Sequence, residues 1–160
     1  MTMVFVEGPP DLALVRALGF TRKNSKRLGP KGEVIKHLMK KTGALALVDE
    51  DPGETSSRRL QSMRKEELEH NLLCYTDAKS GNKIIALRPR LEDWIIGICK
   101  VAGVSLEKGF SLPESPKELH RILPQQLPGF ERLLKRLLTE RNPSLRYLQD
   151  LLIGPAGSGS

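Results

Sequence analysis

Residues 44–53 read ALALVDEDPG, and residues 4–11 read VFVEGPPD. In both stretches a short apolar run leads into acidic residues, Glu7 in one and Asp49 and Asp51 in the other, followed closely by glycine or proline. This pattern is typical of a buried parallel strand that ends in a turn. Ligands of open α/β sheets bind at the carboxyl edge of such strands. The sequence therefore predicts an α/β fold with carboxylates at that edge.

The rest of the chain continues this alternation of apolar strands and amphipathic helices. The predicted elements are a strand at 3–6, helices at 11–18 and from about 31 to 43, a strand at 44–48, a hairpin or edge pair at 72–75 and 83–87, a largely buried helix at 90–102, and helices at 116–123, 128–140 and 143–153. Residues 20–28 are too basic and polar to predict a strand, and residues 54–62 predict a mobile loop.

The domain organisation follows from the order of these elements. With 160 residues and 39% apolar content the chain suits one core of ordinary size. We expect an α/β unit at 1–103, a helical extension at 104–153 that packs on it, and a disordered tail at 154–160. The leucine-rich C-terminal helices also carry basic residues, so a homodimer surface is the alternative to packing on the sheet.

The composition favours a polyanionic partner. The formal net charge is +7 and the pI about 9.6, which favours nucleic acid or phosphorylated ligands over cationic substrates. Cys74 and Cys99 lie in apolar stretches without metal-ligand spacing, so we interpret them as reduced core residues. Because no leader-like segment or apolar run of about eighteen residues is present, we expect a soluble cytoplasmic protein that contacts no membrane.

The acidic residues at the two strand ends predict a cation site. At about 5 Å and an effective dielectric near 20, each like-charged pair costs about 3 kcal/mol. One group must then take up a proton, or the set must bind a cation. Oxygen ligands select Mg²⁺, Mn²⁺ or Ca²⁺ over zinc. If the strand continues past Asp49, its period of two places Asp51 on the same side as Asp49 and Glu50 on the other.

A basic stretch between the two strands is the candidate phosphate site. Its cations, with no acid among them, are Arg22, Lys23, Lys26, Arg27 and Lys31. Lys31 is favoured because residues 29–32, GPKG, open a helix whose free N–H groups suit an anion. The alternative interpretation is a solvated basic face.

The remaining candidates for site chemistry have simpler interpretations. His37, His70 and His120 have no paired metal spacing, which favours surface or structural roles. Trp94 has helical spacing from apolar neighbours and is interpreted as a core residue.

Glu7-Gly8 after a first strand and Asp49-x-Asp51 after a later one, with an α/β alternation between them, resemble the Toprim domain over residues 3 to 100. The Glu-Gly-x-x-Asp form is most similar to standalone Toprim proteins and to the overcoming-lysogenization-defect nucleases. The resemblance implies a mostly parallel, four-stranded sheet between helices. It also implies that Glu7 is the general acid or base, and that Asp49 and Asp51 hold Mg²⁺, with Mn²⁺ as a substitute.

Two further acidic residues are candidates for the same site. By similarity to the nuclease branch, Glu92 at the start of the predicted helix 90–102 would complete the metal site. Asp11 is either a helix N-cap or a ligand, because it follows Glu7 by four residues.

The functional hypothesis is divalent-metal-dependent phosphodiester chemistry on DNA or RNA by a nuclease-like Toprim protein. The alternative is a non-catalytic module of the same fold that binds nucleic acid or assembles with a protein partner.

Overall fold

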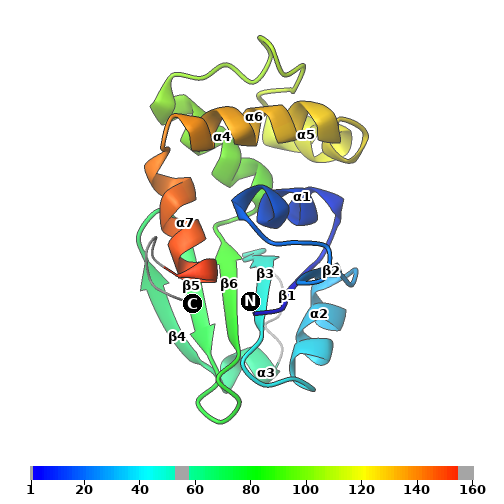
Figure 1. The fold of residues 1–160 in the computed structure, drawn as a ribbon, viewed down its shortest axis with the longest axis vertical. Coiled ribbons are helices and arrows are strands. Elements are labelled where there is room, and N and C mark those ends of the chain that lie inside the picture. The colour runs from blue at the N-terminus through cyan, green and yellow to red at the C-terminus, as the bar shows by residue number, and fades with distance from the viewer. Residues whose placement is uncertain (1, 53–57, 155–160) are drawn as a thin grey trace.

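The computed structural model describes residues 2–52 and 58–154 and shows a central sheet with helices on both faces (Figure 1). The six strands are β1 (Val4–Val6), β2 (Ser25–Arg27), β3 (Leu45–Asp49), β4 (Arg64–Leu68), β5 (Leu72–Thr76) and β6 (Lys83–Leu87). Their order in the sheet is β2-β1-β3-β6-β5-β4. The first four strands in this order are parallel, and β5 and β4 are antiparallel to their neighbours.

The α/β class is confirmed, but the expected four-stranded sheet is wrong because the sheet is mixed and has six strands. The sequence missed β2 and β4. Both are edge strands and mostly exposed, so neither shows the apolar pattern by which buried strands are recognised. The expected hairpin is confirmed as the antiparallel pair of β5 and β6.

The helices mostly follow the predicted pattern, but the helix predicted from about 31 to 43 ends at Leu38, because the carbonyls of Leu38 and Lys41 bond the buried amide of Asn82 instead of continuing the helix. The helices are α1 (Pro9–Leu18), α2 (Lys31–Leu38), α3 (Arg58–Gln61), α4 (Leu91–Ala102), α5 (Pro116–Ile122), α6 (Leu127–Thr139) and α7 (Pro143–Ile153), with a 3₁₀ turn at Leu123–Gln125. The predicted mobile loop at 54–62 is wrong where it overlaps α3, and its residues 54–57 lie outside the described residues. The predicted tail lies outside them too, apart from Gly154.

Local sequence chemistry sets where α1 begins and ends. Pro9 and Pro10 occupy the first helical turn, where a missing N–H costs nothing. The carboxylate of Asp11 accepts the N–H of Gly8, the N-cap residue, at 3.1 Å. Gly19 closes the helix with a φ of 126°, which favours glycine. Helix α1 therefore begins immediately after Glu7 at the end of β1.

Two apolar cores lie on the two faces of the sheet. One joins β1, β3, β5 and β6 to α1, α4 and the C-terminal helices, and the other joins the opposite face to α2 and α3. Figure 1 shows α1, α4, α5 and α6 gathered beyond the ends of β3 and β6, and α7 beside β5 and β6. The C-terminal helices thus share a core with the α/β unit. The domain boundary at 103/104 and the homodimer surface stay predictions.

The residues interpreted as apolar core are confirmed. Trp94 is 4% exposed and donates its indole N–H to the carbonyl of His70 at 2.7 Å. Cys74 and Cys99 are buried and free.

One buried polar side chain ties the end of α2 to the start of β3. Asn82 is fully buried, and its amide nitrogen donates to the carbonyls of Leu38 at 3.0 Å and Lys41 at 2.9 Å. Its amide oxygen accepts the N–H of Ala44 at 2.9 Å. The loop between α2 and β3 is therefore held by three hydrogen bonds from one residue.

We expect Asn82→Ala to lower the free energy of unfolding by about 2–4 kcal/mol, because it leaves the buried N–H of Ala44 and the partly buried carbonyl of Lys41 without their hydrogen-bond partner. Urea denaturation measures the effect. The control is Asn24→Ala, because the partly exposed side chain of Asn24 makes no hydrogen bond among the described residues. Equal midpoints for the two variants would contradict this prediction.

Candidate functional site

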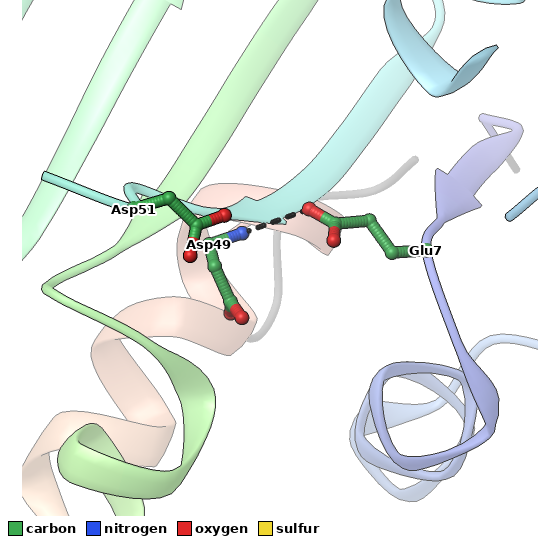
Figure 2. A group of neighbouring side chains, drawn as sticks. All are labelled: Glu7, Asp49 and Asp51. Carbon is green, nitrogen blue, oxygen red and sulfur yellow. Dashed lines mark hydrogen bonds between the residues drawn. The ribbon is translucent and has the colours of Figure 1, made fainter. Parts of the chain in front are cut away.

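Three carboxylates meet at the carboxyl edge of the parallel strands. Glu7 follows β1, Asp49 is the last residue of β3, and Asp51 lies two residues further on. Strands β1 and β3 are hydrogen-bonded neighbours in register, with Val6 opposite Leu47. One oxygen of each carboxylate lies within 4.8 Å of the others. Figure 2 shows Glu7 reaching from the end of β1 toward the two aspartates, so the sequence prediction that these residues meet is confirmed.

Backbone and guanidinium groups hold the three carboxylates in place. Glu7 Oε1 accepts the N–H of Asp49 at 3.1 Å (Figure 2), and Asp49 Oδ1 accepts the N–H of Leu91 at 2.9 Å. Arg90 donates from Nε to Asp51 Oδ1 at 3.0 Å. All three carboxylates stay partly exposed. The contacts therefore orient the group without covering it.

Asp51 joins the other two carboxylates through a turn, and not through the strand alternation that the sequence predicted. Strand β3 ends at Asp49, and Asp51 has a φ of 51°, so strand alternation does not place it. Aspartate tolerates this left-handed conformation better than most residues. The N–H of Asp51 donates to the carbonyl of Pro89 at 3.0 Å, which anchors the turn. Glu50 lies outside the group, as expected, and pairs with Arg88 at 3.2 Å.

Burial and mutual repulsion favour the protonated form of two acids in this region. Burial raises the pKa of Asp49 to about 7, and the nearby charges of Glu7 and Glu92 act in the same direction. Burial likewise raises the pKa of Asp11 well above its usual range, with further contributions from Asp49 and Glu7. At neutral pH, uptake of a proton or a cation therefore lowers the electrostatic repulsion in the site.

Asp11 and Glu92 lie beside the three carboxylates but not among them. Both line a cleft of about 320 Å³ together with Glu7 and Asp49. Asp11 is not the N-cap of α1, because that position is Gly8 and Asp11 lies three residues later. Neither residue belongs to the group of Glu7, Asp49 and Asp51, whose oxygens lie within 4.8 Å of one another. Their metal-ligand role stays a prediction.

The sequence did not single out His120 and Arg90 for this region. The ring of His120 is 75% exposed, and its Nδ1 lies 2.8 Å from Oε1 of the buried Glu92. His120 also lines the acidic cleft. It belongs to α5, far along the chain from the acidic residues, so no local spacing could have indicated it. His37 contacts Phe5, and His70 contacts Ser144.

The predicted phosphate-binding residues are divided between different surfaces. Lys31 Nζ donates to the carbonyl of Glu50 at 2.9 Å, which places it next to the acidic turn. Arg22 and Lys23 are exposed between α1 and β2, and Lys26 and Arg27 are exposed on β2 itself. A phosphate-binding role for these five residues stays a prediction.

The donor set of the three carboxylates suits a hard divalent cation. It consists of oxygens from two neighbouring strand ends, and carboxylate oxygens are the ligands that Mg²⁺ and Mn²⁺ prefer. Within residues 2–52 and 58–154 this is the single group of three or more acidic, histidine or cysteine residues with such spacing. Glu7, Asp49 and Asp51 are therefore the residues that could hold a metal.

Comparisons with protein-family models, curated proteins and solved structures gave no match to this chain. None of the helices in the described part of the chain is long and apolar enough to cross a membrane.

We expect the stability of the metal-free protein to fall as pH rises from about 4 to 7. The folded state keeps a proton on Asp49 up to a pKa of about 7, whereas the unfolded chain loses it near 3.8. The native state therefore binds more protons in this window, and the free energy of unfolding decreases with pH. Asp49→Asn removes this contribution, on the order of 2–4 kcal/mol, while an amide oxygen can still accept the N–H of Leu91.

The measurement is urea denaturation in EDTA at several pH values. Asp150→Asn is the control because Asp150 is an exposed aspartate on α7. Parallel pH profiles for the wild type and Asp49→Asn would show that Asp49 does not carry the effect.

Proposed function

We propose that this protein is a Toprim-like enzyme that hydrolyses phosphodiester bonds of DNA or RNA with a divalent metal ion. The observation that carries the proposal is the meeting of three carboxylates from two adjacent parallel strands, with one oxygen of each within 4.8 Å of the others. The Toprim resemblance seen in the sequence supports it, because that domain likewise has a glutamate after the first strand and an Asp-x-Asp after a later one.

The proposed roles follow from the position of each side chain. Asp49 and Asp51 would hold the metal, and Glu7 would act as a ligand or exchange a proton with the attacking or leaving oxygen. A bound Mg²⁺ stabilises the charge that develops on the reacting phosphate and its oxygens. The pKa of Asp49 is about 7 without metal, so a fraction of the molecules carries a proton on this residue at neutral pH. Metal binding would release that proton.

The surroundings of the carboxylates suit a phosphate. Gly29 and Pro30 line the acidic cleft immediately before α2 begins at Lys31. The N-terminus of a helix favours an anion, and the ammonium group of Lys31 lies beside the acidic turn. A substrate phosphate here would complete the metal coordination, as Mg²⁺ sites usually require.

One observation favours a second function, that of a non-catalytic module that binds nucleic acid or a protein partner. Arg90 already places a positive charge on Asp51, at 3.0 Å. A guanidinium next to these carboxylates neutralises part of their negative charge without any metal. In that case the fold would persist while the carboxylates served a structural role.

We expect Mg²⁺- or Mn²⁺-dependent cleavage of labelled DNA or RNA to fall at least about a hundredfold in Asp49→Asn and in Asp51→Asn, because each variant removes a charged ligand. Gel electrophoresis of the products measures the rate. Glu50→Gln is the matched control, since this neighbouring carboxylate points to Arg88. Cleavage that persists in both aspartate variants would rule out the proposed roles.

A metal titration separates the two candidate functions. If the group binds Mn²⁺, a concentration one hundred times the dissociation constant should stabilise the wild type by about 2.7 kcal/mol. Asp51→Asn should lose this gain, and Glu50→Gln should keep it. A wild type whose unfolding midpoint does not respond to Mn²⁺ or Mg²⁺ would favour the non-catalytic module.

A further inference from the structure

A basic groove lies at the end of the sheet opposite the acidic group. It has a volume of about 680 Å³ and is bounded by the starts of β1 and β3, the edge strand β2 and the end of α2. Three lysines line it, Lys26, Lys40 and Lys41, and its lining contains no aspartate or glutamate.

The lysines come from two segments that the fold brings together. Lys26 pairs with Phe5 in the parallel register of β1 and β2, so its side chain projects to the same face of the sheet as Phe5. That face is the one covered by α2. Lys40 and Lys41 follow α2 directly and line the groove from the other side.

The loop that carries Lys40 and Lys41 is held rigidly. The buried amide of Asn82 bonds the carbonyls of Leu38 and Lys41 and the N–H of Ala44. The loop therefore presents its cations in a defined place, which reduces the ordering cost of binding an anion.

The ammonium groups in this groove lack protein partners. Lys26, Lys40 and Lys41 make no side-chain hydrogen bond or ion pair with any residue in the described ranges. The acid of α2, Glu33, lies at the other end of that helix, in its first turn. Three unpaired cations around one hollow favour an anionic occupant.

The groove and the acidic group lie at opposite ends of the same two strands. Glu7 follows Met3 by four positions, which corresponds to about 13 Å along β1. A nucleic-acid strand carries one phosphate about every 3.4 Å of helix axis, so a nucleic acid that runs over the surface needs at least about four nucleotides to reach from one end to the other. A small anion cannot occupy both ends, whereas a polynucleotide can.

We propose that this groove binds backbone phosphates of a nucleic acid whose neighbouring segment lies at Glu7, Asp49 and Asp51. The choice of nucleic acid over other polyanions rests on the function proposed above. Lys26 was a candidate for phosphate binding from the sequence, but Lys40 and Lys41 were not. The groove gives these three residues one common role, separate from that of Lys31.

The test measures binding of labelled DNA and RNA oligonucleotides of twelve nucleotides by fluorescence anisotropy in EDTA, where no cleavage occurs. The variant K26Q/K40Q/K41Q should bind at least about tenfold more weakly at physiological salt. The slope of log affinity against log salt should fall by about 2 for single strands and about 3 for duplexes. The control K65Q/K100Q/K108Q removes the same charge from exposed lysines outside the groove.

Equal effects of the two triple variants would overturn the proposal, as would a wild type that binds neither oligonucleotide at low salt. Displacement of the oligonucleotide by polyglutamate at equal charge concentration would assign the groove to an acidic polypeptide and also overturn it. The three single variants provide the same comparison if the triple variant fails to fold.

The binding result is independent of catalysis. Groove-dependent binding in EDTA without any Mn²⁺-dependent cleavage would support the groove while the proposed enzymatic function fails. If cleavage depends on Asp49 and Asp51 but binding is unchanged in the variants of the groove lysines, the proposed enzymatic function stands and the proposed role of the groove is wrong.

Discussion

Parallel pairing of β1 with β3 is the constraint on which the rest of the site depends. It places the carboxyl ends of both strands at one edge of the sheet, and an acidic residue follows or ends each strand. The core on both faces holds these strands in register, because their residues alternate between the two apolar clusters. The carboxylates are therefore brought together by the burial of Val4, Phe5 and Val6 and of their partners in β3, against their own repulsion.

The connection from β6 to α4 forms the other wall of the site. It supplies the N–H of Leu91 to Asp49, the guanidinium of Arg90 to Asp51 and the carbonyl of Pro89 to the backbone of Asp51. These groups compensate part of the acidic charge, and yet the pKa of Asp49 remains near 7. The site therefore combines a frame of hydrogen bonds with closely spaced carboxylates, whose mutual repulsion a divalent cation or a proton relieves.

The elements that the sequence predicted correctly have either a buried apolar run or clear boundary residues such as proline and glycine. Strands β1 and β3 are short apolar runs buried on both faces, and proline or glycine marks the ends of α1 and α4. Strands β2 and β4 were missed because an edge strand has only one neighbour and little burial. Short α3 lacks enough turns to show a helical period.

The sequence by itself determined the α/β class, most of the helix ends and the presence of Glu7, Asp49 and Asp51 at strand ends, because these depend on the order of neighbouring residues. Tertiary structure alone decided that Asp51 reaches the group through a left-handed turn, that His120 meets Glu92, and that Lys26 shares a groove with Lys40 and Lys41. Each of these involves the packing of separate segments or a backbone conformation set by such packing, and no local pattern of residues encodes that.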